Sequence, residues 1–450
     1  PINLLFYTIL VLYFKLQLFF SIFYDSIITV KINLYKEEIM GKVLGIIAEY
    51  NPFHNGHLYH LEQAKKLTGS SYTVAIMSGN FTQRGSTAII DKWSRAEIAL
   101  NCGIDLVLEL PTLYATSSAE NFADGAVKIL NSLKVVDYLA FGAETSDMDI
   151  LSPIADILYK EPKAYRLLLS SELKKGISFP KARENALMLY LGNIRKYLNI
   201  LNNPNNILGL EYMKALKKNN SIIEPVAITR FEAGYNDVSY SGNIASATAI
   251  RNIIKNGNFK ALRKLVPAPS YGILIDNIKQ GHIIPDISVF ERQIIYNLRK
   301  MTLDEIKELP DVSEGLEHSL KKAANSCNTI TEFLALIKSK RYTSTRIQRI
   351  LLYSLLGITK KDMALSKKVQ TPYIRVLGFT KRGQFLLSEI AKANPKLDII
   401  TSVKRFADTS TNKNLRLMLE KDVCSTNIYS IGYDFDSCSN MDFTKKIITM

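Results

Sequence analysis

The fold of this chain is decided by residues 50–57, Tyr50-Asn-Pro-Phe-His54-Asn-Gly56-His57. Before them lies a short apolar run, Val43–Ala48, which is typical of a buried strand. After them lies Leu58–Leu67, whose apolar stripe predicts a helix. Two histidines therefore stand where a strand passes into a helix N-terminus. Free backbone N–H groups and the helix dipole make such a junction a natural anion site.

The chemistry of this junction suits a phosphate. Imidazoles at His54 and His57 can donate hydrogen bonds to phosphate oxygens as charge builds up on them. Gly56 leaves room for a phosphate to approach closely. We therefore predict nucleotide binding, with His54 and His57 as the catalytic residues. The alternatives are a structural loop or a metal-binding pair. A metal site is not predicted, because no cysteine lies nearby and only His60 follows.

Strand-like and helical segments alternate along the first half of the chain. Strands are predicted at Val43–Ala48, Thr73–Met77, Leu106–Leu110, Tyr138–Phe141 and Ala227–Arg230, and helices at Leu58–Leu67, Ser94–Cys102, Ala119–Leu133 and through most of Leu151–Asn202. Such alternation implies an α/β fold with a parallel sheet and right-handed crossovers. Ligands of these sheets bind beyond the carboxyl ends of the strands. We expect His54, Gly79 and Glu109–Pro111 to converge there.

Several stretches together carry a resemblance to a known family. Residues 45–58 resemble the opening of the bacterial tRNA(Met) cytidine acetate ligases, which belong to the HxGH nucleotidyltransferase superfamily. The HxGH element alone would indicate only the superfamily. The resemblance runs from about residue 40 to the C-terminus and includes Met77–Gly85, Asp91–Glu97, Leu108–Pro111, Phe141–Glu144 and Asn205–Gly209. These neighbouring stretches narrow the match to the family.

The pattern and the resemblance together predict two domains. A Rossmann-like HUP/nucleotidyltransferase domain is expected at residues 40–266, and a second, mostly helical basic domain at 267–450, with a linker marked by Pro269 and Gly272. The resemblance implies that ATP, with Mg²⁺, activates acetate as acetyl-adenylate. The acetyl group then passes to N4 of the wobble cytidine (C34) of elongator tRNA(Met). Two alternatives remain open, an adenylyltransferase for a small acceptor and a non-catalytic RNA-binding protein.

The resemblance also implies a set of nucleotide contacts. They are Ile47, Ala48, Glu49, Tyr50, Asn51, Pro52, Phe53, His54, Asn55, Gly56, His57, Leu58, Tyr59, His60, Gly142, Asn205 and Arg230. A second phosphate motif of this superfamily often reads Ile-Ser-Ser-Thr-x-Ile-Arg. Residues 244–251 match it at Ser246, Thr248 and Arg251, although Ala245 and Ala247 depart from it. The alternative is an ordinary helix cap with a surface arginine.

Basic and aromatic residues interleave in the predicted second domain. Arg346 and Arg349 should share one helix face, with Arg341 just before them. Tyr373–Phe379 is followed by Lys381 and Arg382. Such a mixture suits phosphate contacts and base stacking, and the family resemblance implies RNA binding by these cations. The alternative is a solvated helix face with buried aromatic residues.

The composition of the chain restricts its possible functions less than the motifs do. A net charge of +15 with a hydrophobic content of 47% favours a folded protein with a polyanionic partner, nucleic acid first. Abundant Lys, Asn and Ile residues offer codon bias as an alternative explanation. The four cysteines are far apart, which is typical of reduced cytosolic thiols, and predicts a cytoplasmic protein.

The first 39 residues raise a separate question. Ile2–Tyr24 is mostly apolar and long enough to span a membrane or to serve as a signal sequence. The chain begins with Pro1, and Met40 stands immediately before the first predicted strand. We therefore expect residues 1–39 to be upstream translation and the protein to have no membrane partner. The alternative is a genuine N-terminal anchor.

Overall fold

The computed structural model describes most of the chain after residue 40. The described residues are 41–192, 194, 197, 200–230, 243–338, 342–435 and 439–450. The expectations for residues 1–39 and for Arg341 lie outside them. Among the described residues, no helix combines the length and the apolar character that crossing a membrane requires.

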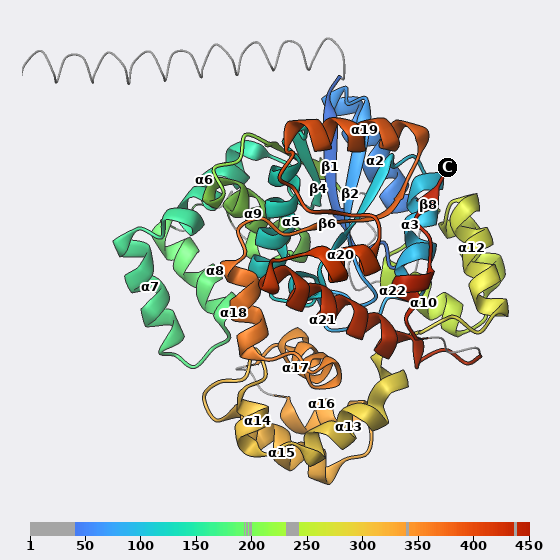
Figure 1. Cartoon of the computed structure of the whole chain (residues 1–450). Coiled ribbons are helices and arrows are strands. Elements are labelled where there is room, and N and C mark those ends of the chain that lie inside the picture. The colour runs from blue at the N-terminus through green and yellow to red at the C-terminus, as the bar shows by residue number, and fades with distance from the viewer. Residues whose placement is uncertain are drawn as a thin grey trace, which may run out of the picture.

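A single twisted sheet forms the centre of the molecule (Figure 1). Its strand order is β5-β4-β1-β2-β3-β6-β7, and β8 pairs with β6. The first five strands are parallel. The bounds are β1 Val43–Ala48, β2 Tyr72–Ser78, β3 Leu106–Leu110, β4 Tyr138–Ala143, β5 Glu224–Thr229, β6 Ile374–Phe379, β7 Ile399–Ile400 and β8 Ile448–Thr449. The predicted α/β fold and all five predicted strands are therefore confirmed, with β5 starting three residues earlier than expected.

Helices cover both faces of the sheet because its strands are apolar on both sides. Along β2, Val74 and Ile76 belong to the larger core, whereas Ala75 and Met77 belong to the smaller one. The larger core includes α5 (Ala119–Leu133) and α9 (Pro204–Lys218). The smaller core includes α2 (Asn55–Thr68), α3 (Lys92–Asn101), α10 (Ala247–Lys255), α11 (Phe259–Leu265) and α12 (Ala268–Lys279).

Two further groups of helices lie around this centre. Between β4 and β5 lie α6 (Met148–Lys160), α7 (Lys163–Leu173) and α8 (Phe179–Tyr190), as the helical prediction for this region required. A block of helices lies below the sheet in Figure 1, within the part of the chain predicted to be mostly helical. It comprises α13 (Glu291–Lys300), α14 (Leu303–Lys307), α15 (Leu316–Ser326), α16 (Ile330–Ile337) and α17 (Ser344–Leu356).

Two expectations about the second half are wrong. Pro269 and Gly272 do not mark a linker but lie within α12. Proline is tolerated in the first turn of a helix, where its missing N–H would have no partner, and Ser270 anchors this turn by donating to the Phe53 carbonyl at 2.8 Å. The stretch Tyr373–Phe379 is not an RNA-facing surface, because it forms the buried strand β6.

The C-terminal part of the chain returns to the sheet. After α18 (Lys360–Lys368), β6 pairs antiparallel with β3, and β7 and β8 flank β6. The helices of this part are α19 (Lys381–Ala393), α20 (Val403–Thr409), α21 (Lys413–Ser430) and α22 (Met441–Thr444). The predicted division at residues 266 and 267 therefore does not bound the sheet, since residues after it supply three of the strands.

Four buried charged side chains connect the C-terminal part of the chain to the rest of the sheet. Lys92 Nζ lies 2.8 Å from a Glu109 oxygen and 2.7 Å from Asp442 Oδ1. Arg375 of β6 lies 3.1 Å from Glu109 and also pairs with Asp442. All four side chains are almost inaccessible to solvent, so each charge depends on its partners. The four together join α3, β3, β6 and α22.

We predict that Asp442→Asn lowers the free energy of unfolding by about 3–5 kcal/mol, because Lys92 and Arg375 are then left buried with one carboxylate between them. Chemical denaturation at pH 7 measures the change. The control is Asp408→Asn, which alters an exposed carboxylate of α20 and should cost less than about 0.5 kcal/mol. Equal stabilities for the two variants would contradict the role given to the four charges.

Candidate active site

The two histidines cap the helix that they begin. His54 is the N-cap of α2, and its Nδ1 accepts a hydrogen bond from Gly56 N at 3.0 Å. His57 Nδ1 accepts one in return from His54 N at 3.3 Å. The rings stack with centroids 3.8 Å apart. The helix therefore begins at Asn55, earlier than the predicted Leu58, because these side chains satisfy its first N–H groups.

This capping assigns the tautomer of each ring. A neutral imidazole has one N–H and one bare nitrogen, and Nδ1 is the acceptor in both rings. The proton therefore lies on Nε2 of His54 and of His57. Burial lowers the pKa of His54 to about 3, helped by the charges of Arg230 and Arg251. Burial also holds the pKa of His57 well below its ordinary value. At neutral pH both rings are uncharged and keep a donor for a ligand.

Gly56 also makes room for the ring of His54. A Cβ at this position would lie 2.9 Å from the imidazole of His54, so a side chain here would displace the ring. The backbone of Gly56 also donates the hydrogen bond that orients that ring. The glycine therefore allows the ring of His54 to approach the backbone and orients that ring.

The loop between β1 and α2 is fixed from several sides. Arg95 of α3 donates to the carbonyl of Glu49 at 2.7 Å, and Asn51 bonds the backbone of Thr87 and Ile89. Tyr50 and Phe53 are buried and pack against the ring of His57, with centroids 5.1 and 5.5 Å away. The predicted contacts of this segment, from Ile47 at the end of β1 through Leu58, Tyr59 and His60 in α2, are continuous with this loop.

Gly142, Asn205 and Arg230 come together at the ends of β4, α9 and β5. Asn205 Nδ2 donates to Glu144 at 2.6 Å, and Arg230 Nη1 donates to Asn205 Oδ1 at 3.3 Å. A Cβ at Gly142 would lie 3.3 Å from the side chain of Arg230. The charge of Arg230 reaches His54, His57 and His60, whose pKa values it lowers. The three predicted residues thus border the histidines.

The second motif lies against the first. Ser246 is the N-cap of α10, and its Oγ accepts from Ala249 N at 3.1 Å, as an ordinary cap does. Arg251 donates to the Asn51 carbonyl at 2.8 Å and to Thr248 at 3.1 Å. The arginine is therefore not a remote surface residue but contacts the histidine loop directly. The serine cap and the arginine contact together place α10 at the site.

The prediction missed Arg84, which lies on the loop after β2. Its neighbour Gln83 donates from its backbone N to Glu49 at 2.8 Å and from Nε2 to the Ser117 carbonyl at 3.1 Å. Burial lowers the pKa of Arg84, and its charge lowers the pKa values of Arg230 and Arg251. Three arginines thus share one site. The sequence signal that could have indicated Arg84 was its position in the loop after the carboxyl end of β2.

The structure places the predicted RNA contacts in different environments. Arg349 is 8% exposed and pairs with Asp311 at 2.7 Å, so it packs within the protein and is corrected to a buried ion-pair residue. Arg346 shares the same face of α17 and donates to the Asp311 carbonyl at 2.8 Å. Lys381 and Arg382 are exposed at the start of α19, where Arg382 also pairs with Asp105 at 3.1 Å. RNA contact by these residues stays a prediction.

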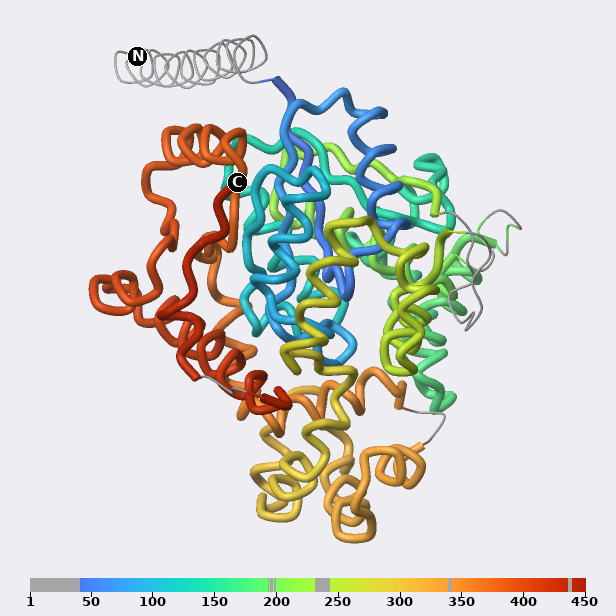
Figure 2. Tube along the Cα trace, turned by 90° about the vertical axis from the view of Figure 1, so that its right-hand side faces the viewer, coloured from blue at the N-terminus to red at the C-terminus, as the bar shows by residue number. Residues whose placement is uncertain are grey.

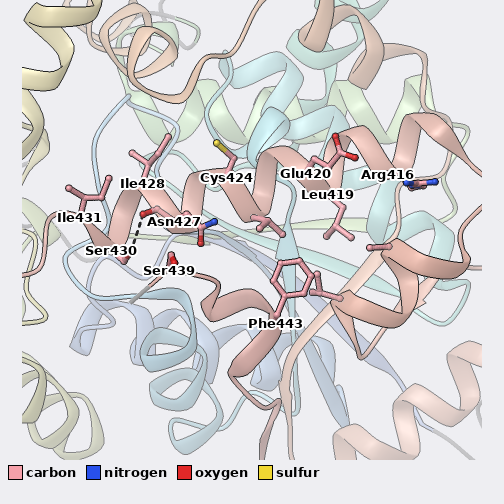
Figure 3. A pocket seen from close by; sticks show the side chains of 13 residues that line it. Arg416, Leu419, Glu420, Cys424, Asn427, Ile428, Ser430, Ile431, Ser439 and Phe443 are labelled. Carbon is pink, nitrogen blue, oxygen red and sulfur yellow. Dashed lines mark hydrogen bonds between the residues drawn. The ribbon is translucent and has the colours of Figure 1, made fainter. Parts of the chain in front are cut away.

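A well-formed concavity lies elsewhere in the molecule. It has a volume of about 580 Å³ and is lined mostly by apolar residues of α20, α21 and α22, among them Leu419, Ile428 and Phe443 (Figure 3). It contains none of the predicted nucleotide contacts. Among the described residues, no group of three or more His, Cys, Asp or Glu side chains could hold a metal ion.

Comparison with known proteins identifies the family. A sequence model of the HIGH nucleotidyltransferase family matches residues 41–444. The tRNA(Met) cytidine acetate ligase of Caldanaerobacter subterraneus subsp. tengcongensis is 47% identical over 410 residues, which are 91% of this chain and 100% of that protein. That of Acetivibrio thermocellus is 42% identical over 416 residues, with the same two coverages.

Solved structures agree with the sequence match. The apo crystal structure of Thermotoga maritima TmcAL has a TM-score of 0.87 and 39% identity, covering 91% of this chain and 99% of that one. A second crystal form of TmcAL, bound with alpha-thio ATP, has a TM-score of 0.85 and 38% identity with the same coverage. The chain therefore belongs to the HIGH nucleotidyltransferase family and, within it, to the tRNA(Met) cytidine acetate ligases.

Proposed function

We propose that this chain is an ATP-dependent ligase that activates acetate and acetylates N4 of the wobble cytidine of elongator tRNA(Met). The observation that carries the proposal is the pair of neutral histidine donors at one helix N-terminus, with Arg251 bonded to the loop before it and the charge of Arg230 acting on both rings. Its specific form follows from relatives that carry this activity in their names and match over their whole length.

The first step joins acetate to AMP. An acetate oxygen attacks the α-phosphorus of ATP, a P–O bond forms, and the bond to the β-phosphate breaks so that pyrophosphate leaves. Negative charge grows on the phosphate oxygens as this happens. The Nε2–H groups of His54 and His57 are donors fixed in advance, so they can stabilise that charge without reorganising. Arg84, Arg230 and Arg251 supply positive charge for the departing pyrophosphate.

The second step consumes acetyl-adenylate. The cytidine N4 amine attacks the acetyl carbon, the bond to AMP breaks, and N4 loses a proton. Mg²⁺ would shield the β- and γ-phosphates when it is bound. The donor set fits an ion carried mainly by the triphosphate, because the nearby carboxylates Glu49, Glu144 and Asp286 already act on the charges of Arg230 and Arg251. The chain's own contribution is to bind and orient the phosphates.

The direct test is acetate-dependent exchange between pyrophosphate and ATP, followed by transfer of labelled acetate to tRNA(Met) transcripts with cytidine or uridine at position 34. We expect exchange with acetate alone and transfer only to the cytidine transcript. Exchange that requires a small phosphorylated acceptor instead would favour an adenylyltransferase. Absence of any exchange by the folded protein would favour a non-catalytic RNA-binding protein.

We predict that His57→Ala slows acetate-dependent exchange by about a hundredfold or more, because one fixed donor to the developing charge is lost. Thermal unfolding of the variant measures the accompanying loss of the helix cap, which should cost about 1 kcal/mol. The matched control is His318→Ala, at an exposed position of α15, which should exchange at the wild-type rate. Full activity in His57→Ala would remove this ring from the mechanism.

We predict that Arg84→Ala reduces kcat/KM for ATP in the exchange reaction by about 10- to 100-fold, because a charge-assisted hydrogen bond to phosphate is lost. Arg84→Lys should recover part of the activity, since the charge is kept and the planar fork is not. The comparison variant is Arg405→Ala, which changes an exposed arginine of α20. Identical kinetics for Arg84→Ala and Arg405→Ala would place Arg84 outside the phosphate site.

A pH prediction follows from the neutral histidines. The profile of kcat/KM for ATP reports groups of the free enzyme, so it should show no histidine inflection near pH 6.5. The free energy of unfolding, by contrast, should depend on pH in this range. The unfolded chain binds these protons near pH 6.5, whereas His54 does so at about pH 3 and His60 at about pH 4, so the free energy of unfolding should fall as the pH drops from 6.5 towards 4.

Chemical denaturation at several pH values measures this loss. Each of the two rings contributes at most about 1.4 kcal/mol per pH unit within that window. His60→Gln should flatten the dependence by about one proton, whereas His318→Gln should leave it unchanged. An unaltered slope in His60→Gln would show that this ring is not held neutral by folding.

A further inference from the structure

A basic face lies beside the nucleotide site and plays no part in the chemistry described so far. It is formed by Lys260, Arg263 and Lys264 on α11, all exposed. The C-terminal end of α11 contacts the histidine loop directly, because Asn55 Nδ2 donates to the Lys264 carbonyl at 2.9 Å. Asn55 is the residue after His54. The face therefore adjoins the point at which acetyl-adenylate would form.

The charge of this region is unbalanced in the sequence. Residues 243–275 contain five lysines and arginines and no aspartate or glutamate. Lys255 pairs with Asp286 at 3.3 Å. Within the part of the chain that the structure describes, no carboxylate pairs with Lys260, Arg263 or Lys264. Figure 2 shows the yellow-green segment of α10–α12 across the face of the molecule turned to the viewer.

An aromatic ring accompanies these cations. The guanidinium of Arg263 lies 5.9 Å from the ring centroid of Tyr271 in α12. A planar guanidinium held in this way offers a surface on which an unpaired base can stack, while the lysines on either side suit phosphates. The placement of cations at a helix C-terminus also complements the helix dipole, but this interaction weakens within the last turn and does not account for Lys260.

The proposed reaction brings backbone phosphates of the RNA close to this face. A cytidine amine reaches an adenylate beside His54 only if its nucleotide is unstacked and delivered to the site. The sugar-phosphate backbone on both sides of that nucleotide must then lie at the mouth of the site. Cations next to Asn55 are in position to neutralise those phosphates.

We propose that the exposed face of α11, formed by Lys260, Arg263 and Lys264, binds the phosphate backbone of the RNA next to the cytidine that is acetylated. The proposal rests on the proposed function and names the surface that presents the RNA to that site. It assigns the face to RNA and not to ATP, because the phosphate donors for ATP lie on the loops after β1 and β2 and at the start of α10.

The test variant is the triple substitution Lys260→Gln, Arg263→Gln and Lys264→Gln. The matched control neutralises three exposed cations beside the edge strand β7 and in α20, Lys396→Gln, Lys404→Gln and Arg405→Gln. Both variants change the net charge equally, so a difference between them reports position. Acetate-dependent exchange without RNA, KM for tRNA(Met) in acetyl transfer, and tRNA affinity over a salt series are measured for each.

We expect the α11 variant to exchange within about twofold of wild type, to raise KM for tRNA about tenfold or more, and to lower the slope of log K against log salt by roughly 2–3, since each lost phosphate contact removes about 0.7–0.9. The control should match wild type. Unchanged KM and slope in the α11 variant, or an equal change in the control, overturn the proposal. Loss of exchange would instead assign the face to ATP and overturn it as well.

These outcomes are separable from failure of the proposed function. A wild-type protein that binds tRNA but shows no acetate-dependent exchange would refute the ligase reaction. The affinity and salt slope of the α11 variant would still decide whether this face contacts RNA.

Discussion

The site depends on the reciprocal capping of α2 by His54 and His57. Each ring gives its Nδ1 lone pair to a backbone N–H of the same helix start, and each is left with one proton on Nε2. A serine or aspartate would cap a helix equally well, but it would not turn an N–H donor towards a ligand. The same two side chains thus build the helix terminus and the anion site. This explains why Gly56, which lets the ring of His54 approach, is part of the motif.

Several positive charges act on one another around the histidines. Arg230 and Arg251 each lower the pKa of His54, and Arg84 lowers the pKa values of both arginines, so like charges crowd one another. Glu49 and Glu144 oppose this repulsion in part. A polyphosphate would relieve what remains. Like charges brought together at one place are typical of sites whose binding energy comes from an oppositely charged substrate.

Sequence reasoning reached the elements that local pattern controls. The apolar runs located the strands, and the histidine motif located the junction between β1 and α2. Sequence reasoning was wrong where contacts with residues far away in the sequence determine the position of a side chain. Arg375 stands among aromatic residues and resembles an RNA contact, yet Glu109 and Asp442 draw it into the interior. The start of α2 was also placed too late, because histidine is not among the residues that usually cap helices.

Arg346 and Arg349 both make contacts within the protein that position their helix. Both bond Asp311 and so fix the position of α17. The loop that carries Arg84 rests on that helix, since a Cβ at Gly85 would come within 2.5 Å of the Arg349 backbone. Tyr353 of α17 also donates to the Thr116 carbonyl at 2.8 Å. The helical block below the sheet and the loop that carries Arg84 are therefore packed against each other.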